Sequence, residues 1–340
     1  MKIASTISVL IVFTFISSSF IFAAKPAQKS KKARAIPVLW QKPGNIASRN
    51  LYFGPGSAAL APAPPFTFLK EDKDGESPKF KIRDARNVEW SVKLGEEAQS
   101  ETVATRLVWA VGYFAEEAYY FDRARIRNLP RLSRGREYVQ GEGVVRGARF
   151  EPRRSGVMRG DAWAWDDNPF VGTRELSGLK VLMILLNNYD ARDANNRVLI
   201  TRNPRRSRLE ARYVVTDLGA TLGKAAGRGG GRSKNDLEDF LSTRFVLGVE
   251  DGAVEFDYDT RPTGLGTLTI VYPPYYMGEV EKEKNMRGIP VAHARWIGSL
   301  LSQLTDEQLR DAFRAADYDR ETMEGYVRAL RTRINQLTRL

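Results

Sequence analysis

The alternation of apolar and polar residues predicts a first half of the chain that is rich in strands. The segment VEWSVKL at 88–94 alternates with a period of two, as a half-buried strand does. Similar short patterns recur before and after it, separated by Gly, Pro and charged residues. The predicted strands of the first half are 65–69, 80–82, 88–94, 118–126 and 138–151, and two short strands are predicted in the second half, at 197–200 and 212–216.

Apolar residues at helical spacing predict a second half that is rich in helices. One helix is already predicted among the strands of the first half, where Val103, Leu107 and Val111 form one apolar stripe and Gly112 is a stop signal. Thr305 followed by Gln308 predicts a capping box at the start of a later helix. The predicted helices are 96–113, 173–187, 292–304, 306–316 and 320–337. Strands followed by helices predict an α+β fold with two lobes, at 66–172 and 173–340.

The N-terminus has the pattern of a targeting segment. Lys2 is followed by an apolar run at 7–24 without charge, which ends in the small residues Ala23 and Ala24. This pattern predicts a signal peptide at 1–24 and an exported protein, periplasmic or extracellular. An uncleaved membrane anchor at 7–24 is the alternative, because the run is almost long enough to span a bilayer.

Residues 25–65 have the composition of a linker. The part at 25–36 is basic and contains no acid, and the part at 41–65 contains the turn and polyproline signals FGPGS and APAPP. We therefore expect compact structure to begin near Phe66.

Composition then restricts the chemistry. The chain of 340 residues has no Cys and one His, so Cys-ligated metals, thiol nucleophiles and multi-His sites are excluded. His293 begins a predicted helix and is interpreted as structural. The formal charge of +12 favours an anionic surface or polymer as partner. The Arg cluster at 202–212 is either a basic patch or a solvated turn. Specific nucleic-acid binding is not expected, because basic and acidic residues are interspersed and no recognition motif is present.

Three short segments could build a site from the residue types that remain. Lys93 ends a predicted strand, and the helix that follows carries Glu97 and Glu101. A second segment, DARDAN at 190–195, follows a hydrophobic helix, and a third, Asp-Leu-Gly at 217–219, follows the strand RYVVT. Each segment alone is weak evidence, because such residues are common on strand edges and in turns.

Taken in order, the three segments resemble the catalytic core of the protein-kinase-like fold, the class of protein kinases and phosphoinositide-type lipid kinases. The resemblance implies that Lys93 binds the phosphates of ATP. It implies Glu101 as the partner of Lys93, with Glu97 as the second choice. Asp190 would be the catalytic carboxylate.

The same resemblance implies a metal and a nucleotide. Asn195 and Asp217 would bind Mg²⁺, and Gly219 would complete the nucleotide-binding turn. Hard oxygen ligands of this kind suit Mg²⁺, and phosphoryl transfer needs neither His nor Cys. The chain departs from the family pattern because no G-x-G-x-x-G loop precedes Lys93, and Leu218 replaces the usual Phe. It has Asn188-Tyr189-Asp190 where protein kinases have His-Arg-Asp.

These features predict a divergent phosphotransferase that uses ATP and Mg²⁺ to phosphorylate a hydroxyl acceptor. The alternative is an exported, inactive kinase-like scaffold that binds an anionic envelope polymer or a protein partner. The chain also looks like a bacterial group with exported members, a resemblance that implies no activity. Hydrolysis by the carboxylates of Asp166, Asp167 or Asp190 is a third, weaker interpretation.

Overall fold

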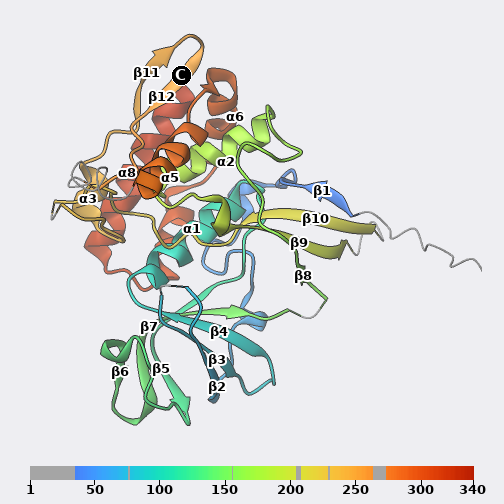
Figure 1. Ribbon diagram of the computed structural model, residues 1–340, viewed down its shortest axis with the longest axis vertical. Coiled ribbons are helices and arrows are strands. Elements are labelled where there is room, and N and C mark those ends of the chain that lie inside the picture. The colour runs from blue at the N-terminus through green and yellow to red at the C-terminus, as the bar shows by residue number, and fades with distance from the viewer. Residues whose placement is uncertain (1–34, 76, 155, 204–207, 229, 263–272) are drawn as a thin grey trace, which may run out of the picture. The chain divides into compact units, whose positions relative to one another are not determined.

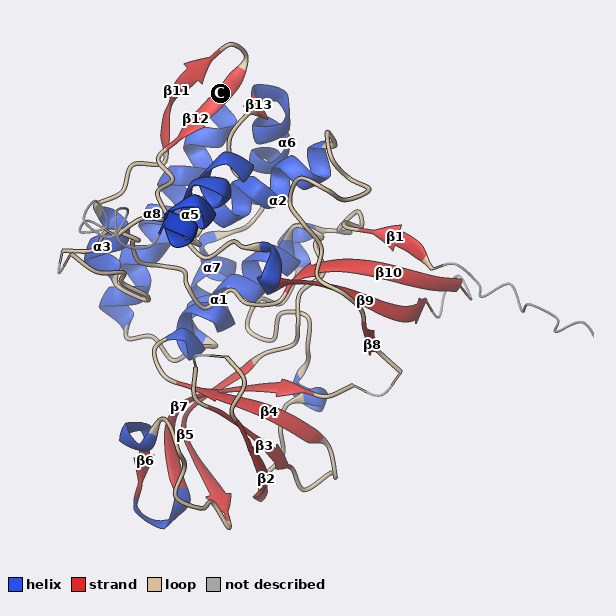
Figure 2. Ribbon diagram, viewed as in Figure 1, coloured by secondary structure: helices blue, strands red, loops and turns tan. Residues whose placement is uncertain are grey.

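The computed structural model describes residues 35–340, apart from 76, 155, 204–207, 229 and 263–272. Residues 66–152 contribute the largest sheet and most helices follow it in the chain, as Figures 1 and 2 show, which agrees with the predicted α+β class. The signal peptide or anchor predicted at 1–24 lies outside the described residues. Within the described ranges, none of the helices has the length and apolar character that crossing a membrane requires.

Six strands form the largest sheet, in the order β4-β3-β2-β5-β7-β6. An additional pairing of β4 with β7 closes five of them into a barrel. Its interior is filled by large apolar side chains, among them Phe80, Trp90 and Phe150. The strands are β2 Phe66–Asp72, β3 Lys79–Arg83, β4 Glu89–Leu94, β5 Tyr119–Arg127, β6 Val139–Gln140 and β7 Val144–Pro152.

Two smaller sheets accompany the helices. The first has the order β1-β10-β9-β8 and contains β1 Ile36–Val38, β8 Met158–Arg159, β9 Asn196–Asn203 and β10 Arg208–Val215. The second has the order β11-β12-β13 and contains β11 Val246–Glu250, β12 Ala253–Phe256 and β13 Ile289–Pro290. Short 3-10 helices lie at η1 Ile46–Ser48, η2 Ala58–Leu60, η3 Arg136–Tyr138, η4 Gly141–Gly143 and η5 Asp193–Asn195.

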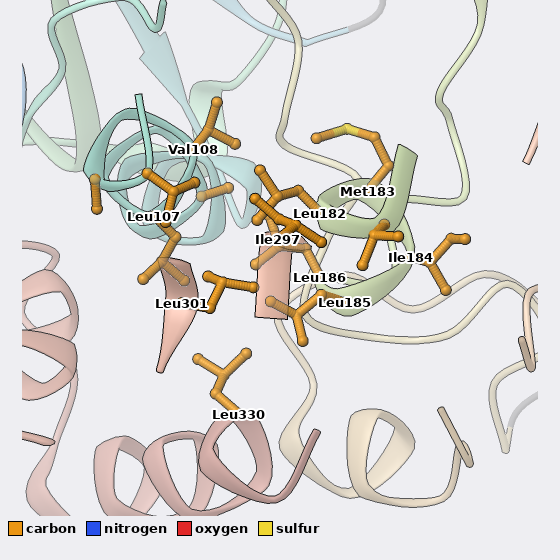
Figure 3. Close-up of a cluster of buried hydrophobic side chains, with 14 of the residues drawn as sticks. Leu107, Val108, Leu182, Met183, Ile184, Leu185, Leu186, Ile297, Leu301 and Leu330 are labelled. Carbon is orange, nitrogen blue, oxygen red and sulfur yellow. The ribbon is translucent and has the colours of Figure 1, made fainter. Parts of the chain in front are cut away.

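The helices enclose a separate apolar core. Figure 3 shows Leu107, Leu182, Ile297 and Leu330 meeting in it from four different helices. The predicted capping box of Thr305 and Gln308 is present at the start of α7. The helices are α1 Glu97–Ala110, α2 Arg174–Leu185, α3 Leu237–Leu241, α5 Pro273–Asn285, α6 Val291–Leu301, α7 Asp306–Arg314 and α8 Arg320–Arg339.

Helix α1 belongs to both parts of the fold. It contacts β4, β5 and β7 of the barrel and α7 among the helices. Gly112 ends it, with φ of +102°, and a Cβ at this position would lie 2.3 Å from the Gln41 carbonyl oxygen. Only glycine combines that backbone conformation with so close a neighbour. The C-terminal end of α1 thereby packs against residues 40–43, and Glu97 at its start contacts Lys93 of β4.

The interpretation of 25–65 as a linker is wrong for residues 35–65. Strand β1 pairs in parallel with β10, and Leu39, Ile46 and Leu51 are each at most 1% exposed in the helical core. The Gln308 side chain donates to the carbonyl oxygens of Ile46 and Arg49, at 2.8 Å each. The turn signals of this segment are real, but its scattered apolar residues lack the periodicity that reveals burial.

Several elements had no predicted counterpart, notably α3, α5 and the hairpin of β11 and β12. Helix α5 begins at Pro273, within the sequence YPPYY at 272–276, whose prolines by themselves favour a turn. Proline is tolerated in the first turn of a helix because those N–H groups have no intrahelical partner. Tyr272 itself and 204–207 of the Arg cluster lie outside the described residues. His293 contacts the Ser177 hydroxyl at 3.0 Å.

Candidate active site

A cavity of about 710 Å³ is lined by residues of the barrel, of α1 and of the sheet that contains β9 and β10. Four of the predicted site residues line it, namely Lys93, Glu101, Asn195 and Asp217. They come from β4, from α1, and from the positions beside β9 and β10. Asp190 is not among the lining residues. The fold thus brings together side chains that are up to 124 positions apart in the sequence.

Lys93 is the centre of an ion cluster and is only 5% exposed. Its Nζ lies 3.1 Å from Glu101 Oε2 and 3.3 Å from Asp217 Oδ1. The sequence left Glu101 and Glu97 as first and second choice of partner. In the structure Lys93 contacts both, with Nζ 2.5 Å from Glu97 Oε2. Burial alone would lower the pKa of Lys93, but the carboxylates of Glu101, Asp217 and Glu97 raise it, so the ammonium stays charged.

Glu97, at the start of α1, also receives contacts from two other segments. Ser77 Oγ donates to its Oε2 at 2.9 Å, and Lys234 Nζ pairs with its Oε1. Burial alone would raise the pKa of Glu97, but the ammonium groups of Lys93 and Lys234 lower it to about 2. The carboxylate is therefore ionised at neutral pH and joins the barrel, α1 and the segment that follows the Asp-Leu-Gly turn.

Arg149 is a second cation in the same wall. It lies directly opposite Lys93 in the pairing of β4 with β7. Its Nε is 3.2 Å from the Glu101 Oε2 that Lys93 also contacts, and its Nη2 is 3.2 Å from Glu151 Oε2. Glu101, 1% exposed, is thus held by cations from two adjacent strands. A buried carboxylate needs such compensation.

The Asp-Leu-Gly turn is docked onto α1. Ser100 Oγ donates to the Gly219 carbonyl oxygen at 2.8 Å. A Cβ on Gly219 would lie 2.7 Å from Glu97 Cβ, so the close packing of this turn requires glycine. The contact fixes Asp217 relative to Lys93, and the Asp217 side chain remains 45% exposed toward the cavity.

Asn195 and Asp217 are neighbours because β9 and β10 pair. The Asn195 carbonyl oxygen accepts from the Thr216 N–H at 2.9 Å and from Thr216 Oγ1 at 3.0 Å. Asn195 Nδ2 donates to Asp190 Oδ2 at 3.0 Å and to the Asp190 carbonyl oxygen at 2.8 Å. With its Nδ2 engaged in this way, Asn195 keeps its Oδ1 as an acceptor.

The residues present fit Mg²⁺ in part. Asn195 and Asp217 offer an amide oxygen and a carboxylate on one cavity wall. Within the described ranges, no three His, Cys, Asp or Glu side chains are grouped so as to hold a metal by themselves. Mg²⁺ commonly takes one or two protein ligands and completes its shell with phosphate oxygens and water. This donor set therefore suits a metal that arrives with a nucleotide.

Asp190 has cations on both carboxylate oxygens. Arg192 Nη2 lies 3.0 Å from its Oδ2, and Lys282 Nζ of α5 lies 3.4 Å from its Oδ1. Sequence reasoning did not select Lys282, Lys234 or Arg149. Lys282 and Lys234 lie in segments without a recognised motif, and Arg149 could have been found only from the pairing of β4 with β7.

Comparison with known proteins adds little to this geometry. No protein-family model and no curated protein matches the chain. The chain is similar to a solved structure of a bacterial kinase. This is the Helicobacter pylori proinflammatory kinase CtkA, with 14% identity, a TM-score of 0.43, and coverage of 80% of this chain and 96% of that one. These values are too low to transfer an activity or site residues, and none of the comparisons supports the resemblance to an exported bacterial group.

Proposed function

We propose that the protein is a divergent kinase-like phosphotransferase with two lobes, which binds ATP with Mg²⁺ in the cavity around Lys93. The observation that carries this proposal is the placement of the Lys93 ammonium within 3.3 Å of both Glu101 and Asp217 in one cavity wall. With Glu97 as a third partner, Lys93 is a buried lysine held by three carboxylates, and its ammonium is therefore fixed in position. Phosphoryl transfer requires such fixed charges more than covalent help from the protein.

Each candidate residue has a distinct role in this proposal. Lys93 would bind phosphate oxygens, and Glu101 would hold its ammonium in place. Asn195 and Asp217 would hold Mg²⁺, which supplies neutralisation of phosphate charge when bound. Gly219 lets the turn approach α1 closely enough to position Asp217.

Asp190 would act on the acceptor. The acceptor oxygen attacks the γ-phosphorus of ATP with a lone pair, and its proton passes to the Asp190 carboxylate. The bond from the γ-phosphorus to the bridging oxygen breaks, and its electron pair leaves with ADP. Asn195 holds Asp190 through two hydrogen bonds, so the carboxylate is oriented before the acceptor arrives.

Nucleotide binding is the first test. We expect ATP with Mg²⁺ to raise the melting temperature of the wild-type chain, because a ligand that binds only the folded state stabilises it. The shift should disappear in Asp217→Ala and in Lys93→Met. Lys70→Met, on an exposed position of β2, is the matched control and should keep the shift.

The inactive scaffold makes a different prediction for the same measurement. A wild-type chain whose melting temperature does not respond to any nucleotide, with or without Mg²⁺, would contradict the phosphotransferase. A chain that is stabilised by ATP and equally so in Asp217→Ala would show binding outside this site. The acceptor can then be sought with the wild-type chain by transfer of a labelled γ-phosphoryl group.

A further inference from the structure

Helix α5 places a lysine against the candidate catalytic carboxylate. Lys282 Nζ lies 3.4 Å from Asp190 Oδ1, and the Lys282 side chain is 10% exposed. It reaches this position from 92 residues further along the chain. Surface lysines are usually solvated and mobile, so a lysine that is largely buried at this place needs a reason.

The Lys282 ammonium is held in place by a buried carboxylate. Glu279, one turn earlier in α5, contacts Lys282 Nζ at 2.8 Å and is only 3% exposed. Glu279 is also paired with Arg232 at 2.8 Å, and Arg232 donates to the Thr260 carbonyl oxygen at 2.9 Å. Both cations contact Glu279 Oε1, so Lys282 belongs to a buried cluster of charged side chains and is not an isolated contact.

The contacts of Asp190 divide between its two oxygens. Oδ2 receives Asn195 and Arg192, whereas Oδ1 receives Lys282. Asn195 lines the cavity that would hold the nucleotide. Asp190 is the carboxylate to which the acceptor would pass its proton. Lys282 therefore contacts Oδ1 of this carboxylate, whereas Asn195 on the nucleotide side contacts Oδ2.

We infer that Lys282 is a positioning residue for phosphoryl transfer. It fixes the orientation of Asp190 and sets a positive charge beside the path of the acceptor oxygen. This inference rests on the proposed function, since it needs ATP as donor and Asp190 as proton acceptor. With water as acceptor, the water oxygen bonds to the γ-phosphorus, one proton passes to Asp190, and the electron pair of the broken bond leaves with ADP.

The test compares turnover with binding in the full chain. The probe is ATP with Mg²⁺, the readout is release of inorganic phosphate with water as acceptor, and the variant is Lys282→Met. We expect kcat to fall about 10²-fold, as when one preorganised charged or hydrogen-bonding group is lost. KM and the thermal shift with ATP and Mg²⁺ should stay near the wild-type values, because Lys93 and Asp217 are untouched.

Two further variants separate positioning from folding. Lys282→Arg keeps the charge and should recover part of kcat. Glu279→Gln leaves Lys282 in place but weakens its anchor, and should lower kcat less than Lys282→Met does. Lys284→Met, on an exposed position of the same helix, is the control and should leave kcat unchanged.

The outcomes distinguish this inference from the proposed function. Unchanged turnover in Lys282→Met overturns the positioning role and leaves the phosphotransferase intact. Faster turnover also overturns it and would identify the contact as inhibitory. If the wild-type chain binds ATP with Mg²⁺ and releases no phosphate, both the inference and the proposed transfer fail. If it binds no nucleotide, the proposed function has failed at the earlier step.

Discussion

Glu97 stands between two ammonium groups, those of Lys93 on β4 and Lys234 in the segment after the Asp-Leu-Gly turn. Each ammonium group pairs with a different oxygen of the Glu97 carboxylate, at the start of α1. The consequence is measurable, since a carboxyl group whose pKa is lowered by folding makes stability depend on pH.

The pKa of Glu97 is about 2 in the folded chain, against an ordinary value of 4.5. Its contribution to stability is therefore fully present above about pH 4.5 and is lost as the pH falls toward 2. We expect Glu97→Gln to destabilise the chain at pH 7 by on the order of 3 kcal/mol. In urea unfolding series the difference from wild type should stay constant between pH 7 and about pH 5, and should shrink as the pH falls from there toward 3.

Glu96→Gln is the control for this prediction, because the neighbouring Glu96 side chain is exposed. It should unfold like the wild type at every pH. A destabilisation of Glu97→Gln that is the same at pH 7 and pH 3 would show that the carboxylate is not held ionised by the two lysines.

The order of three short segments, and its resemblance to the kinase-like fold, was enough to propose Lys93, Glu101, Asn195 and Asp217 together. It was not enough for the cations that complete the site. Arg149 is brought beside Lys93 by strand pairing, and Lys282 and Lys234 by the packing of segments with no recognised motif. Such contacts depend on tertiary structure, which periodicity does not encode.

At the scale of elements, the turn at 217–219 packs directly against helix α1. Ser100 of α1 donates to the Gly219 carbonyl oxygen, and Glu97 of α1 occupies the space that a Cβ at position 219 would need. Any movement of the turn would therefore move the Lys93 cluster. The packing leaves no room for a side chain at position 219.

Gly219→Ala tests this coupling. Its Cβ would lie 2.7 Å from Glu97 Cβ and 2.8 Å from Glu97 Oε2, so the turn or the helix must shift. We expect a loss of stability of about 1–3 kcal/mol, which is typical of overpacking. The thermal shift with ATP and Mg²⁺ should weaken as well, because Glu97 contacts Lys93.

Gly44→Ala is the matched control, since nothing lies within 4 Å of a Cβ at that exposed position. It should change neither stability nor the nucleotide response. Wild-type behaviour of Gly219→Ala in both measurements would mean that the turn is not pressed against α1.

Elements with strong periodicity were predicted well, and those without it were missed. Strand 88–94 and the helix that begins at Asp306 match β4 and α7 closely, because alternation and a capping box mark them. Helix α5 had no predicted counterpart, because Pro273 and Pro274 at its start are turn signals. The proline signal was correct, but the chain continues into a helix, where proline is allowed only at the start.

On the scale of the whole molecule, residues 35–65 matter more than their composition indicates. Leu39, Ile46 and Leu51 are buried in the helical core, and β1 extends the sheet that carries β9 and β10. That sheet places Asn195 beside Thr216 and so supports the cavity wall. A segment read as linker thus contributes to the framework behind the candidate site.

The central claim is that the cavity around Lys93 carries out phosphoryl transfer with Asp190 as proton acceptor. The most direct test is the rate of phosphate release from ATP with Mg²⁺ by the wild-type chain and by Asp190→Asn. Asparagine keeps the shape of Asp190 but takes no proton, so we predict a rate at least about 10²-fold lower with an unchanged thermal shift. Equal rates in the two chains, or no release by the wild type, would contradict the claim.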